Sequence, residues 1–143
     1  MAKIAIAGLC ITSAAAADPI REDNQFGKTS SRRQNSGGFI EVIVRGLRNS
    51  VGRVTCYLFR GKEGFPEEKE KTIAVQSVPI SGNRARMVFP NLPPGEYALA
   101  ALHDENENRK MDYNFIGIPK EGWAFSNIPS GMLRKPDFSE CAF

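Results

Sequence analysis

Apolar and polar side chains alternate with a period of two along much of the chain. Four segments rich in β-branched and aromatic residues show this pattern: residues 39–47, 52–59, 72–80 and 84–89. The alternation is typical of β-strands with one buried face. Short turn sequences, RNSVG at residues 48–52 and SGN at residues 81–83, separate successive pairs of segments. The sequence therefore predicts two antiparallel hairpins.

The segment at residues 97–102 is apolar on both faces and follows a Pro-Pro-Gly turn at residues 93–95. A strand buried on both faces lies inside a sheet, so this segment is predicted to be a central strand. A short last strand is expected over residues 138–143. No segment shows sustained helical periodicity. The predicted fold class is all-β, an antiparallel immunoglobulin-like sandwich of about seven strands, although a closed barrel would give the same pattern.

The N-terminal 17 residues have the organisation of a signal peptide. Lys3 precedes an apolar run, and Ala15 and Ala17 form a cleavage site before Asp18. The run is shorter than the roughly 20 residues of a membrane-spanning helix, and no second one follows. We therefore expect export to the periplasm or the medium, with no transmembrane segment. Residues 18–37 are polar and predict a flexible linker, and residues 38–143 predict one domain.

Two cysteines, Cys56 and Cys141, remain after removal of residues 1–17. In an oxidising compartment they predict a disulfide between an early strand and the last segment. The alternative is two small buried thiols that do not meet. The formal net charge is only +3, and the lysines and arginines are dispersed. Without a basic stripe to follow a phosphate backbone, we expect no nucleic-acid partner.

A segment of about 33 residues between Asp104 and Pro136 lacks a clear strand or helix pattern. Its many apolar residues predict a long ordered loop that folds onto the sandwich. Tyr113, Trp123 and Phe125 offer a platform for sugar rings, such as those of a glycan, or anchor the loop in the core.

The same segment begins with oxygen-bearing side chains at positions 1, 3, 5 and 9 of a calcium-binding loop, at Asp104, Asn106, Asn108 and Asp112. The match is incomplete, because position 6 is Arg109 instead of glycine and position 12 is Phe115 instead of glutamate. Two formal negative charges predict a weak site, with a Kd on the order of 10⁻⁴ to 10⁻³ M. The alternative is a metal-free loop in which these side chains bond their own backbone as Asx turns.

His103, the single histidine, ends the predicted central strand. Its parity places it on an interior face, opposite to that of Asp104, so we expect a buried ring that bonds the backbone of the long loop. A hydrolase or isomerase would instead pair His103 with Asp104, Asp112 or Glu121. A nucleophilic Ser126 has no orienting carboxylate or oxyanion hole that the sequence reveals.

The run from Leu47 to the C-terminus resembles a bacterial family known as domain of unknown function 2141. The resemblance is carried by Gly64–Pro66 (GFP) and by the motifs NLPPGEYALAALHDENEN (91–108), NFIGIPKEGWAFSN (114–127) and PDFSECAF (136–143). The chain departs from the family at Arg109, where a glycine is usual, and at Trp123-Ala124, where an aromatic-glycine pair is common. The resemblance implies an exported β-sandwich, also similar to prealbumin-type modules.

Modules of this kind more often bind ligands or build structures than catalyse reactions. The leading hypothesis is therefore a non-enzymatic module that binds a ligand or another cell-envelope component. Its candidate ligand-binding residues are His103, Tyr113, Trp123 and Phe125. A purely structural envelope protein is the alternative.

Overall fold

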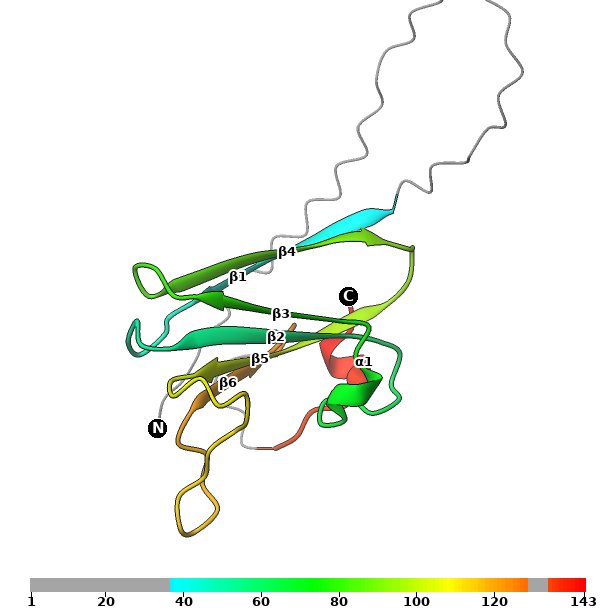
Figure 1. Ribbon diagram of the computed structural model, residues 1–143. Helices are drawn as coiled ribbons and strands as arrows, with labels where there is room; N and C mark the ends of the chain where they lie inside the picture. Colours follow the sequence, from blue (N-terminus) through cyan, green and yellow to red (C-terminus); the bar gives the residue numbers. More distant parts are fainter. Residues whose placement is uncertain (1–36, 129–133) are drawn as a thin grey trace, which may run out of the picture.

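The computed structural model describes residues 37–128 and 134–143, which form six antiparallel strands in two layers (Figure 1). The signal peptide predicted at residues 1–17 and nearly all of the linker lie outside the described residues. The strands are β1 (Gly38–Arg45), β2 (Arg53–Arg60), β3 (Ala74–Pro79), β4 (Arg84–Leu92), β5 (Tyr97–Asp104) and β6 (Gly122–Phe125). A 3-10 turn, η1 (Lys69–Lys71), and a short helix, α1 (Phe138–Cys141), complete the secondary structure.

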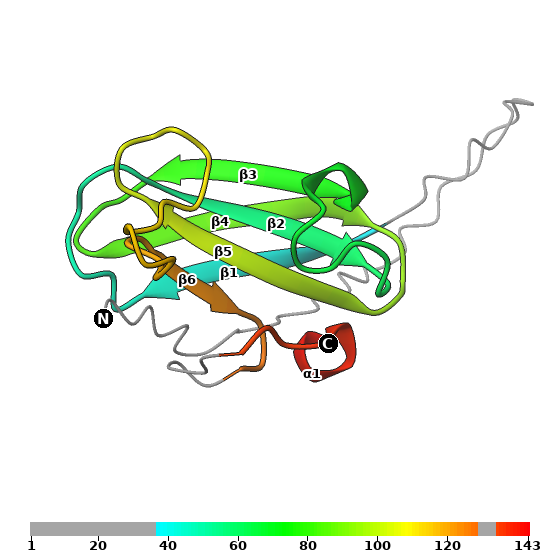
Figure 2. The same ribbon diagram turned by 90° about the horizontal axis from the view of Figure 1, so that it is seen from below.

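The two layers are sheets of unequal size. One contains only β1 and β4, and the other has the order β3-β2-β5-β6 (Figure 2). All pairings are antiparallel. The predicted all-β antiparallel sandwich is thus confirmed.

The two central strands of the larger sheet, β2 and β5, are buried on both faces. On its inner face, Val54, Leu58 and Leu99 pack against Val42 and Phe89 of the small sheet. On its outer face, a second apolar cluster is covered by Phe65 and Phe138, whose ring centroids are 5.8 Å apart. All eight residues of β5 are buried, because the strand has neighbours on both edges and both faces. The prediction of a central strand is confirmed.

Both hairpin predictions were wrong about strand partners. β1 pairs with β4, and β2 pairs with β3 and β5, so residues 48–52 carry the chain from one sheet to the other. The turn at Gly82-Asn83 does form, with φ of +57° at both residues and an Ser81–Arg84 bridge. β3 and β4 then separate into different sheets. Alternation predicts which side chains are buried, and in a sandwich a tight turn connects two layers as readily as two strands of one layer.

Two further elements differ from the sequence prediction. The expected strand over residues 138–143 is the helix α1, since the Glu140 carboxylate accepts the backbone N–H of Asp137 at 2.8 Å and favours a helical turn. Only Phe143 pairs in a strand-like manner, through two backbone hydrogen bonds to Tyr97. The fourth strand of the large sheet, β6, lies inside the segment predicted to be a loop.

Candidate functional site

The polar loop that follows β5 is organised around the buried carboxylate of Asp104. Its two oxygens accept the backbone N–H groups of Asn108 at 3.1 Å and Arg109 at 2.6 Å. These bonds curl the chain tightly, and Glu107 and Arg109 adopt positive φ angles of 59° and 61°. Position 6 of the candidate calcium loop therefore has the left-handed backbone that favours glycine, although an arginine occupies it.

The other three predicted ligands also bond N–H donors of the loop. The side-chain oxygen of Asn106 accepts the N–H of Asn108 at 3.1 Å, and that of Asn108 accepts the N–H of Lys110 at 2.7 Å. The Asp112 carboxylate accepts the side-chain amides of Asn106 at 2.5 Å and Asn108 at 3.0 Å. Within residues 37–128 and 134–143, no three His, Cys, Asp or Glu side chains gather as a metal site. These contacts support the hydrogen-bonded alternative.

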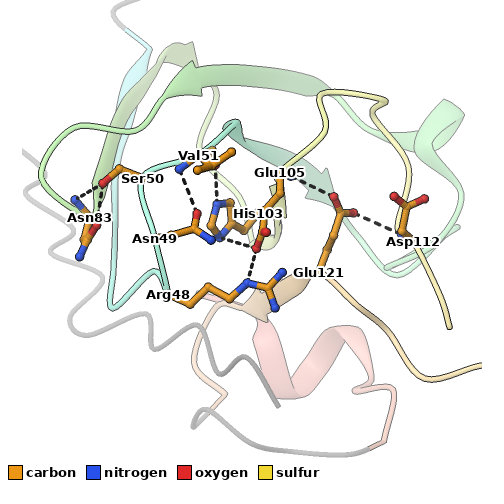
Figure 3. A network of polar contacts seen from close by, with 9 residues as sticks. All are labelled: Arg48, Asn49, Ser50, Val51, Asn83, His103, Glu105, Asp112 and Glu121. Atoms are coloured by element: carbon orange, nitrogen blue, oxygen red, sulfur yellow. Dashed lines mark hydrogen bonds and ion pairs between the residues drawn. The ribbon is translucent and has the colours of Figure 1, made fainter.

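Glu121, which the sequence did not place among the principal site residues, fixes both ends of the polar loop at residues 105–112 (Figure 3). Its side chain is buried, and its oxygens accept the backbone N–H groups of Glu105 at 2.9 Å and Asp112 at 3.2 Å. A buried carboxylate is stable when it accepts such hydrogen bonds. The only signal in the sequence was a lone acidic residue just before an apolar strand.

Residues 112–120, here named the finger, form a narrow hairpin at the end of the sheet opposite to α1 (Figure 1). A Tyr113–Pro119 bridge and the bond from Lys120 N–H to the Asp112 carbonyl hold its two arms together. The side-chain oxygen of Asn114 accepts the N–H groups of Ile116 at 3.0 Å and Ile118 at 2.9 Å. The finger is therefore ordered by its own hydrogen bonds, without help from a core.

Large apolar side chains of the finger point into solvent. Phe115 is 99% exposed, and Tyr113, Ile116 and Ile118 are 57%, 63% and 48% exposed. The expectation that this part of the loop folds onto the sandwich was therefore wrong. Burial was expected because exposed aromatic groups are unfavourable in water, but the local hydrogen bonds shape the finger without burying them.

The predicted aromatic platform is divided between two elements. Trp123 and Phe125 lie half-buried on β6, with ring centroids 5.1 Å apart, and Phe125 also contacts Phe65. They lie on the outer face of the sheet, whereas Tyr113 lies on the finger. Trp123 pairs with Leu102, so it lies on the opposite face of the sheet from His103. The structure does not bring these four candidate ligand-binding residues together.

His103 is completely buried at the inner face of β5. Its Nε2 atom lies 2.9 Å from the carbonyl oxygen of Val51, which belongs to the turn at residues 48–52 and not to the long loop as expected. Its Nδ1 atom has no hydrogen-bond partner within the described part of the chain and lies 3.9 Å from Glu105 Oε1. Glu105 in turn forms an ion pair with Arg48 (Figure 3). The hydrogen bond from Arg48 lowers the pKa of Glu105.

Ser126 lies far from His103. Its hydroxyl accepts the N–H of Leu99 at 2.9 Å and donates to the carbonyl of Cys141 at 2.6 Å. Leu99 is four residues before His103 on β5, which is about 13 Å along a strand. Both hydrogen-bonding functions of the hydroxyl thus serve the packing of α1 against the sheet.

The two cysteines occupy different apolar clusters. Cys56 belongs to the core between the sheets, and Cys141 belongs to the cluster on the outer face of the large sheet. Both thiols are free and buried, so the predicted disulfide is wrong for these two described cysteines. Burial raises the pKa of Cys56 to about 12 and that of Cys141 to about 11. The alternative of two buried thiols that do not meet describes the structure.

A cavity beside the polar loop was not predicted. It has a volume of about 290 Å³ and is lined by Arg53, Ser77, Asp104, Glu107 and Arg109. Arg53 is held there by Ser77, whose hydroxyl and carbonyl oxygens accept hydrogen bonds at 3.1 and 2.7 Å. The cavity is polar and carries charges of both signs.

The fold and the loop define an all-β sandwich domain with a protruding apolar finger. Residues 42–143 match the model of a family described as an uncharacterized protein conserved in bacteria (DUF2141), and the chain belongs to this family. No curated protein and no solved structure matches the chain. Among the described residues, no helix has the length and apolar character needed to cross a membrane.

Proposed function

We propose that the protein is an exported, non-enzymatic binding module that contacts a component of the bacterial cell envelope through its finger. The observation that carries this proposal is the 99% exposure of Phe115 at the end of an ordered hairpin. Single apolar residues are common on protein surfaces, but four large ones on one short projection are typical of an interaction site. Burial of one such side chain contributes roughly 1.5–3 kcal/mol.

The finger is held in one shape by hydrogen bonds, and this supports a role in binding. The side chain of Asn114 bonds both arms, and Glu121 fixes the base to the sheet end. Because the finger is shaped before it meets a partner, association loses less conformational entropy than the ordering of a flexible loop would cost. Export is supported by the signal-peptide pattern of residues 1–17.

Export is tested by fractionation of expressing bacteria and mass spectrometry of the purified chain. We expect the protein in the periplasm or the medium, with Asp18 as its first residue. A cytoplasmic chain that retains residues 1–17 would overturn this part of the proposal.

Contact through the finger is tested by site-specific photo-cross-linking in cells. A photoreactive phenylalanine analogue is placed at Phe115 or, as a matched control, at Val75 of β3, which is 49% exposed. We expect adducts from position 115 and not from position 75. Equal adducts from both positions, or none from either, would contradict a binding role for the finger.

A further inference from the structure

We infer that the finger docks on the surface of an anionic lipid bilayer. This inference rests on the proposed function and names the partner of the same element. Its first support is shape, since the finger projects from the end of the sheet (Figure 1), and Phe115, Ile116 and Ile118 around its turn are exposed. A projecting apolar tip is buried either by a deformable apolar medium or by a matching apolar pocket.

Charge distinguishes these two occupants. Three exposed cationic side chains at the base of the finger are here named the basic collar: Arg109 and Lys110, which precede the finger, and Lys120, its last residue. In the ranges that the structure describes, none of the three forms an ion pair. Apolar tips flanked by lysine and arginine bind bilayers by combining insertion with attraction to anionic headgroups.

The acidic groups of the same loop keep their negative charge but are mostly buried or paired. The carboxylates of Asp104, Asp112 and Glu121 are engaged with N–H donors inside the loop. Glu105 is paired with Arg48, which leaves Glu107 as the exposed acidic side chain next to the collar. Arg48 and Arg53 also lie against the loop, and Lys69 Nζ bonds the Arg109 carbonyl at 2.7 Å, so six cationic groups stand beside five carboxylates. The exposed side chains next to the base of the finger are therefore mainly cationic.

The dimensions also suit a bilayer interface. Residues 112–114 form the extended part of one arm and residues 114–117 form a turn, so at about 3.3 Å per extended residue the tip stands roughly 7–10 Å beyond the base. Interfacial segments bury their apolar side about 5–10 Å into the headgroup region. The tip can thus reach the acyl boundary while the basic collar stays among the headgroups. Tyr113, one residue from the base of the finger, has the amphipathic ring that favours the headgroup level.

A second copy of the chain is a less suitable occupant. The cavity beside Arg53 and Arg109 is polar and would not accommodate Phe115. A protein receptor would have to supply an apolar pocket surrounded by acidic groups, and it becomes an outcome of the test.

The test is flotation of the chain, as isolated from expressing bacteria, with two kinds of vesicle at low salt. One kind is phosphatidylcholine alone, and the other contains about one third phosphatidylglycerol. We expect binding to the anionic vesicles and loss of binding as salt is raised, because screening weakens the attraction of the collar. Whatever part of residues 1–36 the isolated chain retains is the same in wild type and variants, so the comparison among them isolates the finger.

Three variants make the test specific. The tip variant, Phe115→Ser with Ile116→Ser, is expected to bind at least tenfold more weakly, because it removes the inserted apolar area. The collar variant, Lys110→Gln with Lys120→Gln, is expected to lose about tenfold in affinity together with most of the salt dependence. The control Val75→Ser, on exposed β3, should bind like the wild type. Unchanged melting temperatures of all three exclude loss of the fold as the cause.

The outcomes separate this inference from the proposed function. If neither vesicle binds, or the tip variant binds like the wild type, the bilayer inference is overturned. Cross-linking of position 115 to a protein in cells, together with no vesicle binding, would leave the proposed function intact and identify a protein partner instead. Absence of both cross-links and vesicle binding would reject both proposals.

Discussion

The buried carboxylate of Glu121 accepts the backbone N–H of Asp112 at 3.2 Å and so closes the base of the finger. The other oxygen holds Glu105, at the start of the loop. One side chain therefore connects both ends of the loop to β6.

We predict that Glu121→Gln destabilises the domain by about 1–3 kcal/mol, because an amide NH₂ would face a buried N–H donor in place of one carboxylate oxygen. Urea unfolding measures the loss, and hydrogen exchange should show faster exchange at Asp112 N–H. Lys120→Gln, one residue away and exposed, is the control and should change stability by less than about 0.5 kcal/mol. Equal effects of the two substitutions would refute the clamp role.

Gly52 lies where the turn at residues 48–52 crosses the end of β5. Its φ is +74°, and a Cβ atom would lie 2.1 Å from the carbonyl oxygen of Asp104. Gly52→Ala should cost about 3 kcal/mol or more, since both backbone strain and a backbone clash oppose it. Gly82 has a φ of +57° and open space where a Cβ would lie. Gly82→Ala should therefore lower the free energy of unfolding only by the backbone strain, about 1–2 kcal/mol. Thermal or urea unfolding measures both losses of stability. Similar losses for the two substitutions would show that the backbone near Asp104 moves easily to admit a Cβ at position 52.

The Arg48–Glu105 ion pair predicts a pH dependence of stability. Because the pKa of Glu105 is lowered from its ordinary 4.5, mainly by the hydrogen bond from Arg48, the unfolded chain binds more protons in the window below 4.5. The contribution is present above that value and is lost as pH falls through the folded-state pKa. Asn49 and His103 lower the same pKa to a smaller extent.

Arg48→Met should therefore reduce stability at neutral pH by less than about 1 kcal/mol, as for other partly exposed pairs. The difference from wild type should shrink as the pH falls below 4.5 and through the lowered pKa of Glu105. Urea unfolding across this range measures it, with the exposed Arg45→Met as control. A difference that stays constant with pH would mean that Arg48 acts by packing alone.

The buried thiols should be chemically silent in the native state. A thiolate is the reactive species, and burial raises the pKa of Cys56 to about 12 and that of Cys141 to about 11. We expect no reaction of either with an aromatic disulfide reagent near neutral pH, and reaction of both after unfolding in guanidinium. Failure of both to react in the unfolded, unreduced chain would reveal a disulfide.

Calcium should leave the thermal stability of the chain unchanged. The carboxylates of Asp104 and Asp112 already accept N–H donors, so a bound ion would have to displace those bonds. Unfolding in millimolar calcium and in chelator should give melting temperatures within about 1 °C, since only a ligand of the folded state raises stability. A rise that disappears in Asp104→Asn with Asp112→Asn would establish the calcium loop instead.

Within β2 and β5, the sequence was sufficient to predict which side chains are buried. Val54, Cys56 and Leu58 alternate with polar or outward neighbours, and Leu99 and Ala101 oppose Ala98 and Ala100, so strands and the central position of β5 followed. Strand partners did not follow, because the pairing of Ile40 with Phe89 depends on contacts across about 50 residues. The helix α1 is only four residues long and begins with a capping box between Asp137 and Glu140, and periodicity does not reveal so short an element.

The candidate site was predictable in position but not in arrangement. The spacing of Asp104, Asn106 and Asn108 indicated a curled polar loop, and the structure has one. The function of Glu121 depends on N–H groups 9 and 16 residues away, which spacing alone does not identify. The exposure of Phe115 contradicts the usual preference of aromatic residues for burial, and therefore only the three-dimensional structure revealed it.

The pairing of β1 with β4 also bears on where the chain can be shortened. The family match begins at residue 42, inside β1, whereas Gly38 pairs with Leu92 and Ile40 with Phe89. Ile40 is buried in the core, and a two-stranded sheet has no third strand to compensate for a lost end. A chain trimmed to residues 42–143 would expose Phe89 to solvent and favour aggregation, so the independently folding unit begins at least four residues before the family match.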